Sequence, residues 1–239
     1  RILVMTQGVF LRKIQSDPGL EKAGLVIFDE FHERNLDNDL CFALAMDSLE
    51  GFREDLKILV MSATLDAARV ASIMKAAPVV SSRGKTYPVQ TLYTPFTDRM
   101  NQPLDSVQAC VRAISKALKE TRGDILVFLP GAGEIRRLED ILNQSDQQGI
   151  QVLPLYGSLS HAEQDRVFSR AGPLKRKVIL ATAIAETSIT IDGIRVVIDS
   201  GKMRLPVFNT QTGMSRLATL PVSKAAADQR RGRAGRTDR

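Results

Sequence analysis

Short apolar runs alternate with amphipathic segments along the chain. Six of the runs are nearly continuous in aliphatic residues, which is typical of strands that are covered on both faces of a sheet. These predicted strands lie at residues 24–29, 57–64, 124–131, 152–158, 177–183 and 194–199. Between them, apolar residues recur three and four positions apart, as on one face of a helix. The predicted helices lie at residues 38–50, 65–77, 104–120, 133–144 and 161–170.

The order of these elements predicts an α/β fold in which helices flank both faces of a mostly parallel sheet. The alternation breaks once, in a stretch rich in Pro, Ser and Thr between residues 77 and 103. We therefore expect two α/β lobes. The first lobe is predicted to cover residues 1–90, a linker residues 91–103, and the second lobe residues 104–239.

Composition narrows the class of protein only a little. The excess of 33 Lys and Arg over 27 Asp and Glu favours a polyanionic partner, but a net charge of +6 over 239 residues is a weak field and does not establish nucleic-acid binding. Cys41 and Cys110 have no second ligand at metal-binding spacing, so we expect both in the core. No apolar stretch approaches the roughly 18 residues of a membrane span, and no leader segment opens the chain. We expect a cytoplasmic protein that does not bind membranes.

Two acids directly follow the last apolar residue of the first predicted strand, in "LVIFDEFH". The carboxyl ends of strands in an open parallel sheet face the ligand crevice, so Asp29 and Glu30 would point at whatever binds there. One carboxylate could hold a hydrated Mg²⁺ and its neighbour could polarise an attacking water, as in nucleotide hydrolases. An acidic first turn of a helix, favoured by the helix dipole, explains the pair equally simply. His32 alone is more typical of a structural histidine.

The stretch "QRRGRAGR", residues 229–236, is more specific. It places several guanidinium groups on one short predicted helix, with Gly232 and Gly235 allowing close approach. Arg233 and Arg236 are three residues apart and share a helix face, so both could contact one triphosphate. The alternative is a solvated basic segment, but such segments are typically rich in Lys rather than spaced by glycine.

In this order the segments resemble the motifs of superfamily-2 helicases of the DEAH/RHA type, and the bacterial HrpB group in particular. The matching stretches are "TQGVFLRK" (6–13, motif Ib), "DEFH" (29–32, II), "SAT" (62–64, III), "ILVFLPGAGEI" (125–135, IV), "LPLYGSLSHAEQDRVF" (153–168, IVa), "ATAIAETSITIDG" (181–193, V) and "QRRGRAGR" (229–236, VI). Phe31 replaces the usual Ala of the group, as in the HrpB branch. Ala183 replaces Asn, which would remove a backbone contact to RNA, and Arg231 replaces Ala and adds charge.

The resemblance implies two RecA-like lobes, the first incomplete at its N-terminus, that share one site for ATP and Mg²⁺. Asp29 would order the Mg²⁺ shell, with Glu30 beside it, and Glu30 would activate water. His32 would connect this site to motif III through Ser62. On the second lobe, Gln229 would position the water or the γ-phosphate. Arg233 and Arg236 would be arginine fingers that stabilise the charge of the transition state.

Further contacts follow from the same resemblance. The residues expected to contact the nucleotide are Ser62, Thr64, Ser188, Thr190, Asp192 and Phe168. Phe168 would stack on the base, although a plain core position is an equally simple interpretation of it. The residues expected to contact the nucleic-acid backbone, without reading its sequence, are Thr6, Gln7, Gly8, Arg12 and Thr182.

The implied function is an ATP-dependent helicase or translocase that couples hydrolysis to stepwise movement on single-stranded nucleic acid, RNA in particular. A DNA translocase of the same superfamily, a catalytically silent nucleic-acid-binding module and a nucleotide switch are the alternatives. A phosphate cradle requires G-x-x-x-x-G-K-[ST], yet the one "GKT", at residues 84–86, has Val79 in place of the first glycine. We expect motif I to lie upstream of this fragment, and the 239 residues alone to be inactive as an ATPase.

Overall fold

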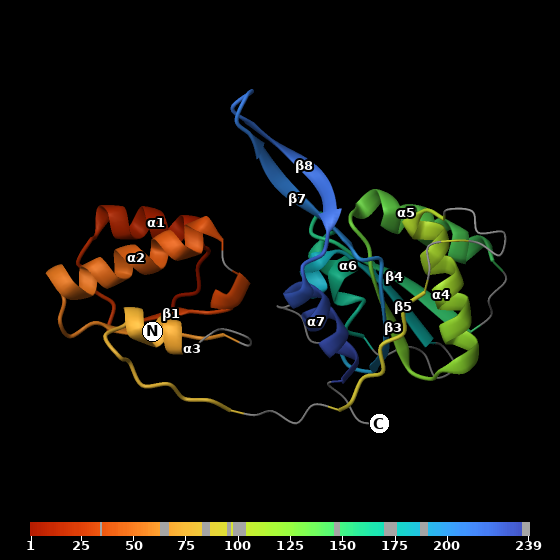
Figure 1. The fold of residues 1–239 in the computed structure, drawn as a ribbon, viewed down its shortest axis with the longest axis horizontal. Helices are drawn as coiled ribbons and strands as arrows, with labels where there is room; N and C mark the ends of the chain where they lie inside the picture. Colours follow the sequence, from red (N-terminus) through yellow and green to blue (C-terminus); the bar gives the residue numbers. More distant parts are fainter. Residues whose placement is uncertain are drawn as a thin grey trace. The chain divides into compact units, whose positions relative to one another are not determined.

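The protein, in a computed structural model, forms two compact units, Arg1–Arg83 and Gly84–Arg239 (Figure 1). The structure describes residues 1–33, 35–62, 67–82, 87–94, 97, 104–145, 149–169, 176–186 and 191–235. None of the helices in these stretches combines the length and apolar character that a bilayer-spanning segment requires. The predicted limits of the two lobes and the linker stay predictions.

The first unit is built on two parallel strands, β1 (Leu25–Phe28) and β2 (Lys57–Val60), with Phe28 opposite Val60. Its helical elements are α1 (Gln7–Ser16), the 3-10 turn η1 (Phe31–Glu33), α2 (Leu36–Gly51) and α3 (Ala67–Ile73). The helices α1 and α2 pack side by side, and the Cys41 thiol lies 3.5 Å from the Gln7 carbonyl oxygen (Figure 1). Cys41 is buried, as predicted from the sequence.

Strand residues of the first unit alternate between covered and exposed positions. Val26 and Phe28 belong to a core that also includes Ile14, Leu20, Phe31, Phe42 and Leu56. Leu25 and Ile27, on the other face of β1, are about half exposed, and so are Leu59 of β2 and the following Met61. The sequence predicts strands covered on both faces, but in the described part of this unit only one face is well covered.

The second unit is a four-stranded parallel sheet in the order β4-β5-β3-β6. The strands are β3 (Asp124–Phe128), β4 (Ile150–Leu155), β5 (Arg176–Ala181) and β6 (Ile194–Asp199). The helical elements are α4 (Ser106–Glu120), α5 (Ala132–Gln144), α6 (His161–Asp165), η2 (Ala183–Ala185), α7 (Lys224–Gly232) and η3 (Arg233–Gly235).

Successive residues of β3 enter opposite cores, as the two-residue period of a strand requires. Ile125 and Val127 pack with α4 and α5, whereas Leu126 and Phe128 pack with residues of β4, β5 and the turn after α6. All four side chains are almost completely buried. The prediction of a parallel α/β fold covered on both sheet faces is therefore confirmed for this unit.

An antiparallel hairpin, β7 (Lys202–Asn209) and β8 (Met214–Pro221), projects from the second unit (Figure 1). The pattern of the sequence does not predict this hairpin. Pro206 and Pro221 argue against a strand, and polar and apolar side chains are both exposed on the hairpin, so no clear hydrophobic face marks it. Its exposed apolar residues are Leu205, Val207, Phe208, Met214, Leu217 and Leu220.

Candidate functional site

The carboxylates of Asp29 and Glu30 lie at the carboxyl end of β1. Pairing with β2 continues past the strands, because the Met61 amide donates to the Phe28 carbonyl (2.8 Å) and the Phe31 amide to the Met61 carbonyl (3.1 Å). Asp29 and Ser62 therefore occupy the same edge of the parallel pair, and both are exposed. Neither acid lies in the first turn of α2, which instead contains Asp37 and Asp39. The dipole of α2 therefore does not account for the pair, which directly precedes the short 3-10 turn η1.

Glu30 is held in an unusual backbone conformation. Its φ of +50° is in the left-handed region, which costs a non-glycine residue free energy. Its amide donates to Asp29 Oδ1 at 2.8 Å, and its Oε2 lies 3.4 Å from Nε2 of the almost fully buried His32 imidazole. Strained backbone of this kind concentrates at functional sites. The strand end thus brings together three of the predicted site residues, Asp29, Glu30 and His32.

Phe31, between these residues, is part of the core. It is 3 % exposed, and its ring lies edge to face with Phe28 (centroids 6.3 Å apart) and Phe42 (5.1 Å). The larger side chain at this place fills the space between β1 and α2. Glu30 faces outward and Phe31 faces inward, so the buried Phe31 ring anchors the acidic turn to the core of the first unit.

The described residues of motif VI, 229–235, form the end of α7 and the turn η3, and their arginines differ in surroundings. Arg230 is 1 % exposed: its Nε donates to Glu186 Oε1 (2.6 Å), and its Nη1 donates to Asp199 Oδ1 (2.8 Å). Its guanidinium carbon lies 4.9 Å from the centre of the Phe128 ring. Arg231 is exposed and pairs with Asp228 at 3.1 Å. Arg230 is therefore committed to internal ion pairs, whereas Arg231 lies at the surface.

Arg233 and Gln229 are the described members of motif VI to which the sequence assigns catalytic roles. Arg233 is 7 % exposed and Gln229 is half-buried. Next to Arg233, a Cβ on Gly235 would lie 2.8 Å from the Tyr87 carbonyl oxygen, and the Tyr87 amide donates to the Gly235 carbonyl (3.1 Å). Glycine at this position permits the close backbone approach. Arg236 lies outside the described residues.

The predicted nucleotide contacts of motifs III, IVa and V are only partly described. Asp192 is exposed in the turn before β6, whereas Thr64, Ser188 and Thr190 lie outside the described residues. Phe168 is 47 % exposed, in the turn after α6. A plain core role for Phe168 is therefore wrong, and its ring is accessible to a ligand.

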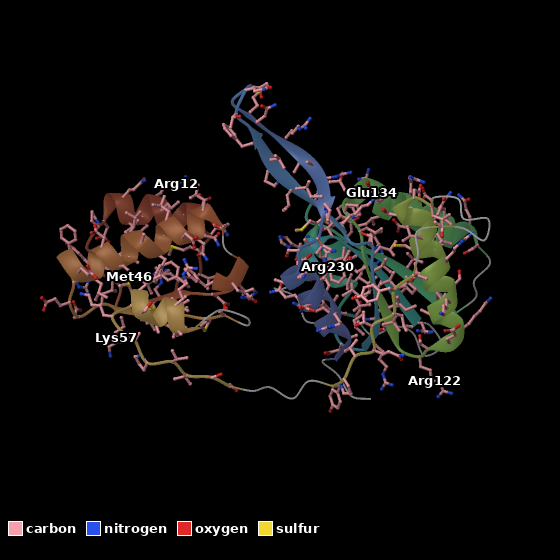
Figure 2. The ribbon with its side chains drawn as sticks, in the orientation of Figure 1. Arg12, Met46, Lys57, Arg122, Glu134 and Arg230 are labelled. Carbon is pink, nitrogen blue, oxygen red and sulfur yellow. The ribbon has the colours of Figure 1, made fainter. Side chains whose placement is uncertain are left out.

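The predicted nucleic-acid contacts of motif Ib gather at the start of α1. Thr6 is the N-cap in an extended conformation without a side-chain capping bond, and Gln7 and Gly8 are the first two helical residues. Gly8 has open space where a Cβ would stand. Arg12 is exposed one turn later, four residues from Gly8 and on the same helix face (Figure 2). First-turn amides and a guanidinium on one face suit a phosphate. Thr182 belongs to the second unit, where it is half-buried directly before η2.

Comparison with known proteins gives a consistent result. A family model for the helicase conserved C-terminal domain matches residues 105–238. The chain is 46 % identical over 238 residues to the ATP-dependent RNA helicase HrpB of Escherichia coli (strain K12), an alignment that covers 100 % of this chain and 29 % of HrpB. The crystal structure of the Escherichia coli DEAH/RHA helicase HrpB superposes with a TM-score of 0.86 at 45 % identity, over 96 % of this chain and 29 % of that one. This chain belongs to the DEAH/RHA helicase family.

A second relative supports the same family. The ATP-dependent RNA helicase HrpA of Escherichia coli (strain K12) is 40 % identical over 237 residues, which cover 98 % of this chain and 18 % of HrpA. The chain thus spans less than a third of the length of the curated helicases it matches. The RecA-like fold predicted from the sequence is confirmed by the match to HrpB.

The structure of this helicase chain adds residues that sequence reasoning missed. Glu186 and Asp199 hold Arg230, and neither was considered functional. Asp199 is the last residue of the strand predicted at 194–199, and Glu186 comes three residues after the strand predicted at 177–183. A position near the carboxyl end of a strand, like that of Asp29 in the first lobe, is the signal that could have found them. The described residues contain no group of three or more His, Cys, Asp or Glu side chains arranged to hold a metal ion.

Proposed function

We propose that the full-length protein containing this chain is an ATP-dependent RNA helicase that hydrolyses ATP and moves along single-stranded RNA. The observation that carries the proposal is the strained turn at the end of β1, where Glu30 lies between the Asp29 carboxylate and the His32 imidazole. Curated relatives of this chain are named ATP-dependent RNA helicases. Exposed carboxylates at a parallel strand end suit nucleotide chemistry.

Asp29 and Glu30 fit a magnesium ion held chiefly through water. Carboxylate oxygens are the ligands that Mg²⁺ prefers, and Mg²⁺ keeps several of its own waters when one or two carboxylates hold it. The ion would supply charge neutralisation to the phosphates when bound. Glu30, beside Asp29, would accept a proton from the attacking water, and His32 would orient the Glu30 carboxylate.

The N-terminal turn of α1, with Thr6, Gln7 and Gly8, and Arg12 one turn later would bind RNA phosphates. Its first-turn amides and the Arg12 guanidinium recognise phosphate without reading the base, which suits a motor that moves over any sequence. Arg233, with Arg236 and Gln229, would contact the triphosphate of a bound nucleotide.

The 239-residue chain alone would not hydrolyse ATP at the rate of a complete helicase. It contains no phosphate cradle that meets the G-x-x-x-x-G-K-[ST] pattern. The exposed Leu25, Ile27 and Leu59 on the second face of the first-unit sheet are also typical of a surface that further structure covers. We expect turnover in the full-length parent and none above background in this chain.

The test compares Glu30→Gln with the unchanged full-length protein in an RNA-stimulated ATP hydrolysis assay. Loss of a general base lowers the rate about 10²- to 10⁴-fold. Glu54→Gln is the matched control, because Glu54 is an exposed carboxylate of the first unit outside the proposed site. Normal turnover of Glu30→Gln would contradict the proposal and favour a catalytically silent nucleic-acid-binding module.

A parallel measurement separates RNA from DNA as the substrate. We expect single-stranded RNA to stimulate hydrolysis more than single-stranded DNA of the same sequence, and Arg12→Gln to weaken this stimulation through loss of a phosphate contact. Stronger stimulation by DNA would instead assign the protein to the DNA translocases of the superfamily.

A further inference from the structure

Lys177 is a buried lysine of β5 that no motif accounts for. It is 4 % exposed, and its ammonium donates to the carbonyl oxygens of Val167 (3.0 Å) and Ser169 (3.2 Å). These two carbonyls belong to the residues on either side of Phe168. A buried ammonium is thus bonded directly to the backbone that carries the exposed aromatic ring.

The positive charge of the Lys177 ammonium is balanced by a carboxylate within the sheet. Asp124 Oδ2, on the neighbouring strand β3, lies 3.8 Å from Lys177 Nζ, and Asp124 Oδ1 accepts the Lys177 amide at 2.8 Å. Burying a lysine is unfavourable unless its charge is paired and its donors are used. Because β3 and β5 are paired strands in the middle of the sheet, Lys177 is a fixed point rather than a mobile side chain.

The turn that carries Phe168 is fixed at further points. Val167 is completely buried, the Phe168 amide donates to the Asp165 carbonyl (3.0 Å), and the Ser169 hydroxyl donates to the Arg166 carbonyl (2.8 Å). Phe168 itself remains 47 % exposed. A phenyl ring held in solvent on a rigid turn buries little apolar area, but it is preorganised for a planar ligand.

We propose that Lys177 is a positioning residue that fixes the backbone on both sides of Phe168 and so presents its ring to the base of the bound nucleotide. The inference rests on the proposed function, because that function supplies the nucleotide. Lys177 itself contacts no ligand. Its contribution is to hold the ring in the orientation that stacking requires, so that binding does not have to order the turn.

A direct test uses fluorescence. The chain contains no tryptophan, so Phe168→Trp gives this chain a single indole reporter at the proposed position. In that background we expect Lys177→Met to lower the steady-state anisotropy of the indole fluorescence and to increase its quenching by acrylamide, because the turn is released. Lys119→Met, at an exposed lysine of α4, is the control and should change neither.

Lys177→Met also leaves the Asp124 carboxylate without its cation and could prevent folding. The double variant Lys177→Met/Asp124→Asn removes both charges and replaces the single variant if that does not fold. We expect it to show the same lower anisotropy and stronger quenching of the indole. Circular dichroism establishes that each variant is folded. A folded variant whose indole reporter is as rigid as it is with Lys177 intact would overturn the proposal.

Kinetics of the full-length protein give the second test. We expect Lys177→Met to raise the KM for ATP about tenfold, the scale of one lost base stack, with little change in kcat. In a Phe168→Ala background the same substitution should have no further effect on KM, because Lys177 acts through that ring. An equal increase in KM with and without the Phe168 ring would indicate general destabilisation and would reject the positioning role.

Absence of ATP hydrolysis in every variant and in the unchanged protein would instead refute the proposed function. The fluorescence test would still decide the role of Lys177.

Discussion

Arg230 is the largest of the fully buried side chains in the described part of the chain. Its guanidinium joins three segments that are distant in sequence: the end of η2 through Glu186, the end of β6 through Asp199, and α7. Arg231, the next residue, is exposed. Adjacent arginines therefore have different functions because one faces the sheet and the other faces solvent, and the letter pattern of motif VI does not distinguish them.

Removal of the Arg230 charge should strongly destabilise the second unit. Arg230→Met leaves Glu186 and Asp199 uncompensated near the protein interior, and breaking a buried ion pair in this way costs about 3–5 kcal/mol. Arg231→Met is the matched control and should change the free energy of unfolding by no more than about 1 kcal/mol, as expected for an exposed pair. Urea unfolding of both variants measures the difference. Equal stability of the two would show that Arg230 does not hold these segments together.

Phe31 gives a residue-scale prediction in the first unit. Because its ring is buried among Phe28 and Phe42, Phe31→Ala should destabilise this unit by about 3–5 kcal/mol, although alanine is the usual residue of the family at this position. Phe52→Ala removes a ring that is 65 % exposed and is the control. Urea unfolding, monitored by a signal from the first unit, should show a larger loss of stability for Phe31→Ala than for Phe52→Ala. If Phe31→Ala lowers the free energy of unfolding as little as Phe52→Ala does, the Phe31 ring does not stabilise the core of the first unit.

At the scale of elements, all six predicted strands form, because short, nearly continuous aliphatic runs favour strands, although β1 and β2 are well covered on one face only among the described residues. Helix limits were predicted less well. The helix predicted at 161–170 ends as an α-helix at Asp165, and the carbonyls of Val167 and Ser169 bond to Lys177 instead of to helix amides. Lys177 lies on another element, so local periodicity of the sequence cannot reveal these bonds.

The candidate site was predictable only in part for the same reason. Asp29 and Glu30 follow a strand in the sequence, and the structure places them at the strand end. The buried partners of Arg230 and the carbonyls held by Lys177 depend on how α7 and the turn after α6 pack against the sheet. These are tertiary contacts between segments 10 to 44 residues apart, which periodicity does not encode.

The start of α4 provides an element-scale prediction about pH. Asp105 is the N-cap: its Oδ1 accepts the Gln108 amide at 2.8 Å and its Oδ2 accepts from Arg137 at 2.7 Å. The Gln108 amide, and then the Arg137 guanidinium, hold the pKa of Asp105 below the ordinary value of 3.8. The stabilisation is therefore complete above pH 3.8 and is lost as the pH falls through the lower pKa of the folded state.

Asp105→Ala should thus lower the free energy of unfolding by about 1 kcal/mol at neutral pH, the usual contribution of an N-cap. The difference between the variant and the unchanged protein should shrink as the medium is acidified below the pKa of Asp105. Urea unfolding at a series of pH values measures both quantities. A difference that does not vary with pH would show that the ionised carboxylate is not what caps α4.

At the scale of the whole molecule, the two units have separate cores and different degrees of coverage. The second unit buries both faces of a four-stranded sheet, whereas the first has two strands with one apolar face largely exposed among its described residues. Buried apolar area is the main source of stability, so the first unit should unfold at a lower denaturant concentration. The chain contains one cysteine in each core, Cys41 in the first unit and Cys110 in the second.

These cysteines allow the two transitions to be followed in one experiment. Burial raises the pKa of Cys110 to about 12 and, with the charge of Asp37 adding to it, raises that of Cys41 as well, so neither thiol forms much thiolate at mildly alkaline pH while its unit is folded. Brief alkylation with iodoacetamide across a urea titration, read by peptide mass spectrometry, should therefore label each cysteine only when its own unit opens. We expect Cys41 to react at a lower urea concentration than Cys110, and Phe31→Ala to shift the Cys41 transition alone. Coincident labelling of both thiols, or a shift of both by Phe31→Ala, would mean that the two units unfold as one cooperative structure.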